Sequence, residues 1–100
     1  MTNQEALNLY QNRTTLKDLK GFKLAKAVIL NMKKIEQEVV EVIREVVKDI
    51  PEEDREKEVA EILSKDCEVK FITLGEDDIP YDISVEQLAL LSYFLPDENL

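Results

Sequence analysis

The sequence predicts a mainly α fold, in which shorter helices pack on one long central helix and residues 67–83 add a minor two-stranded β element. The 100 residues include only two glycines and three prolines, which is typical of long helices and few turns. The longest segment between a glycine and a proline, residues 22–50, has the apolar period of a helix. We expect residues 1–100 to form a single domain, because this length can build one hydrophobic core.

The predicted central helix, residues 22–50, lies between Gly21 and Pro51 and has an unusually broad apolar side. On a helical wheel its apolar residues span an arc of about 160°, whereas a core-facing stripe needs roughly 100° or somewhat more. Glu36 is the one charged residue inside the arc. More than one partner element should therefore cover its members, which are Phe22, Leu24, Ala25, Val28, Ile29, Met32, Ile35, Val39, Val40, Val42, Ile43, Val46, Val47 and Ile50.

The length of this helix also limits the shape of the molecule. At 1.5 Å per residue it would extend about 43 Å, whereas a compact domain of this size has a diameter of roughly 34 Å. The protein is therefore elongated, or the helix is kinked, or a second copy covers the excess.

Shorter helices are expected on both sides of the central one. Thr2 and Glu5 have the spacing of a capping box, so residues 1–20 should form a helical arm folded against the start of the central helix. Pro51, followed by three acids, starts a third helix over residues 51–65, which a short link makes antiparallel to the second half of the central helix. Ser84 and Gln87 repeat the capping-box spacing before a C-terminal helix over 84–95, and residues 97–100 should fray.

The β element is predicted from a change of period after residue 66. Cys67, Val69, Phe71 and Thr73 alternate with their neighbours in the manner of a strand, and Gly75 opens a turn. The segment that follows, residues 79–83, contains Pro80 and can be at most an edge strand. A lone pair of strands is marginal, so the pair should lie on the helices.

Composition excludes several classes of enzyme. The chain has no histidine and one cysteine, which rules out Ser-His-Asp and Cys-His nucleophiles and histidine-ligated metals. Glu36 could act as a general acid or base, but we favour an edge position paired with a basic group. The acids at 76–78 and Asp82 could bind Mg²⁺ or Ca²⁺, yet they lack a calcium-loop pattern and are more typical of an acidic turn. We therefore expect no catalytic activity, no metal and no cofactor.

The sequence favours a cytoplasmic protein. No apolar run approaches the roughly 20 residues that span a bilayer, so we expect no membrane association. The first residues lack the basic start and apolar core of a signal peptide. Because Cys67 is alone, no intrachain disulfide can form, and a reducing compartment fits best.

The net charge of −9 is unevenly distributed along the chain. Residues 1–34 carry a net charge of +5, and residues 35–100 carry −14. These can be solvated faces of opposite sign, or a surface for a charged partner or for an antiparallel second copy. Lysines with no interleaved aromatic residues make nucleic acid an unlikely ligand. The candidate interaction residues are Lys23, Lys26, Lys33, Lys34, Glu38, Glu41, Glu45, Glu52, Glu53 and Asp54.

Three segments of the chain resemble a group of small, mainly helical, functionally uncharacterised proteins of tailed bacteriophages. They are the Asn-x-Glu-x-x-x-Leu-Tyr opening at residues 3–10, the run from Gly21 through Asn31 to Glu36, and the Ile-Pro-x-x-Ile-Ser-x-x-Gln-Leu segment at 79–88. The middle of this chain is shorter than is usual in that group. The resemblance implies a phage origin and a host-cell setting, with no catalytic residue.

These observations lead to two functional expectations. The first is a non-enzymatic phage accessory or assembly protein that docks on another protein, in the host cytoplasm or on the virion. The second is an inhibitor of a host defence enzyme, in which the acidic run from Glu52 to Glu61 imitates a phosphate backbone. Self-association as an antiparallel homodimer through the central helix is a further expectation.

Overall fold

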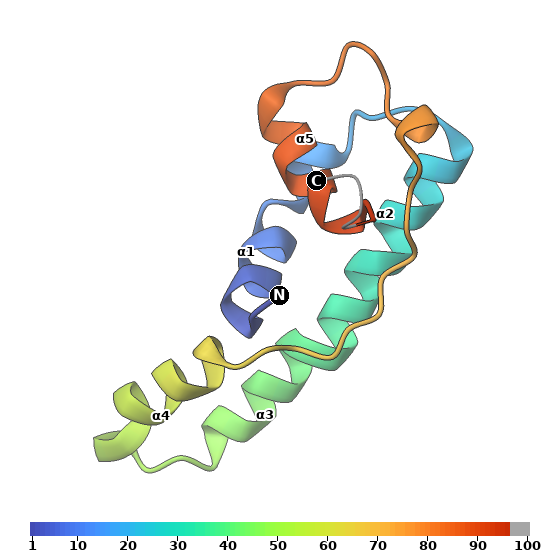
Figure 1. Cartoon of the computed structure of the whole chain (residues 1–100). Helices are drawn as coiled ribbons and strands as arrows, with labels where there is room; N and C mark the ends of the chain where they lie inside the picture. The colour runs from blue at the N-terminus through green and yellow to red at the C-terminus, as the bar shows by residue number, and fades with distance from the viewer. Residues whose placement is uncertain (97–100) are drawn as a thin grey trace.

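The computed structural model describes residues 1–96 and shows an elongated, mainly helical protein (Figure 1). Its extents are 49 × 25 × 21 Å, with a radius of gyration of 15.2 Å. One long helix runs along one side of the molecule and consists of α2 (Phe22–Ile35), a π-helical turn η2 (Glu36–Val40) and α3 (Glu41–Lys48). The prediction of a long central helix is therefore confirmed, with its end two residues before the expected one.

The π-helical turn changes which residues of the central helix face the core. A π turn accommodates one residue more than an α turn, so α3 is rotated by about 100° relative to a uniform α-helix. Ile43 and Val47 consequently lie half-buried and Ile50 is buried, whereas Val42 and Val46 are 51% and 44% exposed. The prediction of one continuous apolar arc was wrong here, because it assumed a constant period of 3.6.

The face that α2 buries also differs from the predicted arc. Leu24, Ala27, Asn31 and Ile35 follow one another at helical spacing and are fully buried. Phe22 and Ile29, which the wheel placed among the core residues, are exposed, as is Glu36. The buried line therefore lies at one edge of the predicted arc, because the partner elements approach α2 from that side.

The N-terminal helix α1 (Asn3–Gln11) packs on the middle of the central helix. Its capping box is formed as predicted, since the Thr2 hydroxyl accepts the Glu5 N–H at 3.1 Å and the Glu5 carboxylate accepts the Thr2 N–H at 2.9 Å. Ala6 and Leu9 enter the core. The arm was expected at the start of the central helix, but α1 contacts η2, α2 and α4, and only the following 3₁₀ turn η1 (Arg13–Leu16) and Leu19 lie near the start.

After Pro51 the chain folds back as α4 (Glu52–Ser64), which contacts both α3 and α1 (Figure 1). Two hydrogen bonds join it to the start of α1. The Asn3 N–H donates to the Lys65 carbonyl at 2.8 Å, and the Asn3 side-chain amide donates to the Ile62 carbonyl at 2.8 Å. No residue of α4 is fully buried, so this helix is fastened at its C-terminal end and faces solvent along much of its length.

The predicted two-stranded β element is wrong, since residues 1–96 contain no strand and only an isolated bridge between Thr2 and Asp66. Residues 67–74 do run extended, and Cys67, Val69 and Phe71 pack against the core. Their neighbour is a helix, however, and the chain then turns through the 3₁₀ segment η3 (Glu76–Asp78). Alternating apolar and polar residues indicate that one face of the segment is buried and the other solvated, but they do not specify which element lies beside its backbone.

A side chain satisfies the backbone of this extended segment. Asn31, completely buried on α2, donates its amide to the Ile72 carbonyl at 3.0 Å and accepts the Ile72 N–H at 2.8 Å. It thus provides both hydrogen bonds that a neighbouring strand would provide. The Lys34 ammonium donates to the Lys70 carbonyl at 2.7 Å, so α2 holds the segment at two positions.

The C-terminal helix α5 (Val85–Leu91) continues into the 3₁₀ turn η4 (Ser92–Phe94) and closes the core. Ser84 and Gln87 form the predicted capping box. Phe94 is completely buried, and its ring meets that of Phe71 edge-on with the centroids 5.1 Å apart. The expected fraying of 97–100 falls outside the residues that the structure describes.

Candidate protein-binding surfaces

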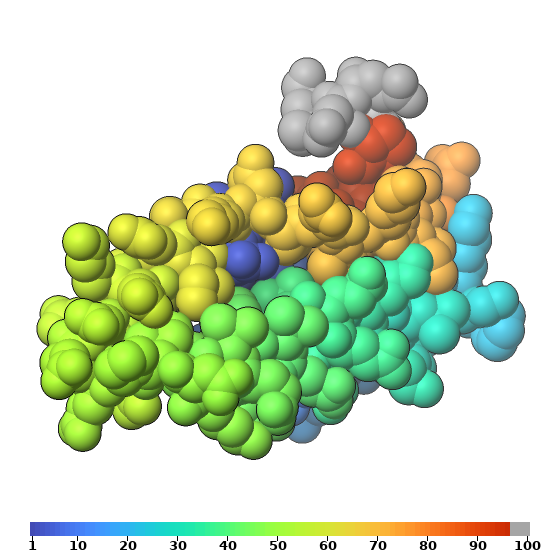
Figure 2. Space-filling view, turned by 90° about the horizontal axis from the view of Figure 1, so that it is seen from below, coloured from blue at the N-terminus to red at the C-terminus, as the bar shows by residue number. Residues whose placement is uncertain are grey.

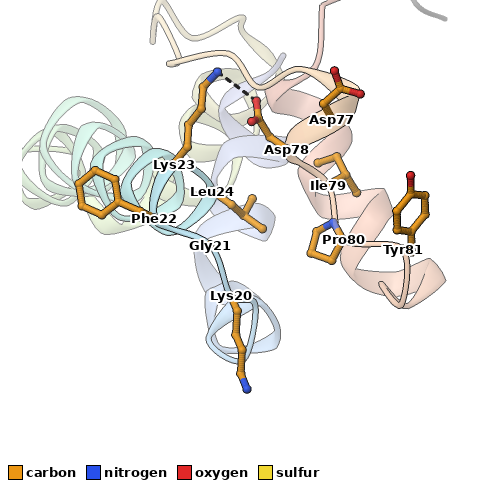
Figure 3. A pocket seen from close by; sticks show the side chains of 10 residues that line it. All are labelled: Lys20, Gly21, Phe22, Lys23, Leu24, Asp77, Asp78, Ile79, Pro80 and Tyr81. Carbon is orange, nitrogen blue, oxygen red and sulfur yellow. Dashed lines mark ion pairs between the residues drawn. The ribbon is translucent and has the colours of Figure 1, made fainter.

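An open cleft of about 440 Å³ lies where α2 begins (Figure 3). Two segments far apart in the sequence form its walls, residues 20–24 at the start of α2 and residues 77–81, which begin within the η3 turn. Gly21 makes the sharp entry into α2 with a φ of 117°, a backbone angle that favours glycine. The cleft is therefore built by a turn, a helix start and a loop.

An ion pair joins the two walls of the cleft. The Lys23 ammonium lies 3.2 Å from the Asp78 carboxylate, which also accepts the Gly75 N–H at 2.9 Å (Figure 3). The hydrogen bond from Gly75 holds the pKa of Asp78 below its ordinary value of 3.8, and Lys23 lowers it further. Both interactions favour the ionised carboxylate, so Asp78 fixes the η3 turn and ties it to α2.

Replacing Asp78 by asparagine should destabilise the chain at neutral pH and have little effect in acid. A carboxylate whose pKa is lower in the folded chain stabilises the fold above its ordinary pKa, and this stabilisation disappears as the pH falls through the lowered value. The difference in free energy of unfolding between the two chains should therefore close below about pH 3.8. Urea denaturation at several pH values measures it. Asp77→Asn, a neighbouring exposed acid, is the control, and an equal effect there would contradict this role.

Exposed aromatic and apolar side chains flank the cleft. Phe22 is 84% exposed, and the Tyr81 side chain is fully exposed on the opposite side of the cleft (Figure 3). Val85, four residues after Tyr81 at the start of α5, is 87% exposed. Tyrosine supplies a large contact area with few rotatable bonds and is enriched among the residues that dominate binding interfaces. Phe22 and Tyr81, on the two sides of the cleft, therefore form a candidate anchor for a protein partner.

The outer face of the central helix is a second exposed surface. Figure 2 shows the atoms of α2 and α3, coloured teal to green, as a continuous band along one side of the molecule. A shallow hollow of about 300 Å³ on this face is lined by Phe22, Ala25, Lys26, Ile29 and Leu30, almost entirely by apolar atoms. On α3, which forms the other half of this outer face, Val42 and Val46 are the exposed apolar residues.

The structure gives different environments to the four candidate lysines. Lys23 pairs with Asp78, and Lys34 donates to the Lys70 carbonyl, so both help to hold the fold together. Lys26 lies 6.0 Å from the centre of the Phe22 ring, and Lys33 is exposed. Neither of these two has an ion-pair partner within residues 1–96.

The six candidate acids are exposed at two places. Glu38, Glu41 and Glu45 lie on η2 and α3, where Glu45 pairs with Lys48 at 3.0 Å. The other three, Glu52, Glu53 and Asp54, form the first turn of α4 at the far end of the molecule. The ten candidates are therefore spread along the molecule, and the structure does not bring them together as one site.

Sequence reasoning missed the buried hydrogen-bonding role of Asn31 and the exposure of Tyr81 and Val85. Asn31 adjoins the apolar arc on the wheel, and a small amide beside a core stripe was the available signal for a buried hydrogen-bonding role. Tyr81 and Val85 carried no such signal, because only the path of residues 79–85 over the helices leaves them uncovered.

Within the described part of the chain, no three His, Cys, Asp or Glu side chains gather in a way that could hold a metal ion. Residues 1–96 also include no helix with the length and apolar character needed to cross a membrane. Comparisons with models of known protein families, with curated proteins and with solved structures found no match to this chain.

Proposed function

We propose that this chain is a non-enzymatic phage accessory or assembly protein that acts by binding another protein. The observation that carries the proposal is the exposure of Phe22 and Tyr81 on the two sides of the cleft at the start of α2. Large apolar side chains lose contact with water when a partner covers them, and this burial is the main favourable term in most protein association.

The geometry of the cleft supports docking of a protein surface. It is open, and it combines apolar walls with charged groups at Lys20, Lys23 and Asp77. Interfaces typically have an apolar centre with aromatic anchors and a polar rim. Phe22 and Tyr81 would supply the centre, and the charged side chains would supply the rim and orient the partner.

The phage setting is supported by the resemblance of residues 3–10, 21–36 and 79–88 to small helical phage proteins. In this setting the partner is a phage or host protein in the host cytoplasm, with the virion as a further location. The same resemblance implies no catalytic residue, which agrees with a binding role.

An inhibitor of a host defence enzyme is the second candidate, and α4 favours it. Six acids of this helix are exposed, and α4 has no fully buried residue, so it presents a protruding negative surface. They are Glu52, Glu53, Asp54, Glu56, Glu58 and Glu61. Such a surface could occupy a groove that normally binds phosphates.

Capture from infected-cell lysate, followed by mass spectrometry, identifies the partner, and two variants then locate the contact. Tyr81→Ala should weaken binding about tenfold or more, as expected for an aromatic anchor. The control is Tyr10→Ala, since Tyr10 lies on α1 and stacks with Arg13. Circular dichroism confirms that each variant is folded.

Reversing the charges of Glu52, Glu53 and Asp54 distinguishes the two candidates. If the partner is a nuclease or helicase, and binding depends on these acids and not on Tyr81, the inhibitor function replaces the first proposal. Wild-type affinity in both variants would contradict both functions at these surfaces.

A further inference from the structure

We propose that the outer face of the central helix binds a second copy of this chain in antiparallel orientation, with Lys26 of each copy opposite Glu45 of the other. This inference deepens the proposed function, on which it rests for the premise that the chain works through protein contacts. The outer face shares Phe22 with the cleft, but Tyr81 lies only at the cleft and Lys26 and Glu45 only on the outer face, so variants at these residues test the two surfaces separately.

The first argument is the arrangement of charge along the outer face. Lys26 and Lys33 are exposed on α2, and Glu41 and Glu45 are exposed on α3. With the π turn included, these four side chains follow one line along the helix, on the side opposite Leu24 and Ile35. One half of the line is basic and the other half is acidic, which makes the face complementary to a reversed copy of itself.

Orientation follows from this layout. A parallel pair would set lysines against lysines and glutamates against glutamates. An antiparallel pair centred near η2 sets Lys26 against Glu45 and brings Lys33 near Glu38 and Glu41 of the second copy. Each exposed ion pair contributes only about 0–1 kcal/mol, so charge selects the direction while apolar burial supplies most of the affinity.

The second argument is the apolar hollow on α2. Its lining residues extend from Phe22 to Leu30 and are centred on Lys26. Glu45 lies nineteen residues further along, about 28 Å away at 1.5 Å per residue. Val42 and Val46 lie on one side of Glu45 and are both exposed. Leu30 lies on this same side of the Lys26–Glu45 line, and in an antiparallel pair the side chains on the same side of the line meet. The register that pairs Lys26 with Glu45 therefore places Val42 of each copy beside Leu30 of the other, at one edge of the hollow.

The π-helical turn gives this match its structural basis. In a uniform α-helix Val42 and Val46 would fall on the same side as Leu24 and Val28, facing the core. The extra residue of η2 turns them outward and brings Ile43 and Val47 inward in their place. Single-turn π segments are rare in proteins, and those that occur often lie at functional sites. Here the turn exposes the two valines, and a partner would cover them.

Light scattering and sedimentation of the full chain over a range of concentrations test the pairing directly. The parent chain should change from monomer to dimer as its concentration rises. Lys26→Glu sets like charges together twice per dimer and should weaken self-association about tenfold, as should Glu45→Lys. The double variant restores opposite charges and should recover dimer formation. Lys57→Glu, which makes the same charge change on exposed α4, is the control.

Disulfide crosslinking in a Cys67→Ser background reports the direction. Chains with Lys26→Cys mixed with chains with Glu45→Cys should form mixed crosslinked dimers, and Lys26→Cys alone should not. A parallel pair would give the reverse result and would overturn the proposal.

A strictly monomeric mass at every concentration, or a double variant that does not recover, would also overturn it. A monomer that still captures its partner through Tyr81 would leave the proposed function intact. A dimer that captures no partner would support the self-association and contradict the proposed function, so the two failures can be told apart.

Discussion

Replacing Asn31 by alanine should lower the free energy of unfolding by about 3 kcal/mol and release residues 67–74 from α2. Asn31 is completely buried, and its amide makes both hydrogen bonds to the Ile72 backbone. Without it, two partly buried backbone groups lose their partner, and a buried group left unsatisfied costs about 1–3 kcal/mol. Urea denaturation measures the change in stability, and hydrogen exchange at the Ile72 amide reports the local release.

Two further variants sharpen this experiment. Asn8→Ala removes an exposed amide from α1 that bonds only within its own helix, so it should change stability little. Asn31→Asp keeps an acceptor for the Ile72 N–H but cannot donate to the carbonyl in its ionised form, and it buries a charge. It should therefore be as harmful as alanine or worse. Equal stability of Asn31→Ala and Asn8→Ala would show that Asn31 does not hold the segment.

Deleting Gln37 should leave the fold intact, whereas deleting Lys26 should destabilise it by about 3 kcal/mol. Gln37 is exposed in the π turn, where the helix already holds one residue more than an α-helix needs. Its removal converts the turn to α-helix and keeps Ile43 and Val47 in their inward positions. Removal of Lys26 instead rotates Leu24 by about 100° relative to Ala27 and Asn31, taking a buried leucine out of the core.

Thermal unfolding compares the two deletions, since both remove one exposed residue from the same long helix. A Gln37 deletion that unfolds the chain as severely as the Lys26 deletion would show that the π turn is not a simple one-residue insertion. In the folded Gln37 deletion, Val42 and Val46 should also stay exposed, because the register after the turn is unchanged.

The elements with local signals were predicted well. Gly21 and Pro51 bracket the central helix, and both capping boxes formed at the spacing seen in the sequence. The chain after Pro51 folds back on α3, because the proline interrupts the helix and a short link leaves little choice of direction. The predictions about partners, the phage setting and the absence of catalysis stay predictions.

The misses share one physical cause, which is competition between distant parts of the chain. Residues 67–74 alternate like a strand, but the amide of Asn31 and the ammonium of Lys34 bind their backbone in place of a second strand. Val42 and Val46 fell in the apolar arc, yet the π turn rotates α3 so that they face solvent. Glu36 is exposed because the partner elements cover the other edge of the arc. Neither effect can be predicted from a short window of sequence.

By itself, the sequence determined that this protein is mainly helical, where its helices begin, and that its basic and acidic residues separate along the chain. Those features depend on local backbone preferences and on composition, which are present before any tertiary contact forms. Only the tertiary structure decided which apolar residues are buried, that a buried asparagine substitutes for a strand, and that Tyr81 and Val42 remain uncovered. Burial depends on which elements meet, and that depends on the packing of the whole chain.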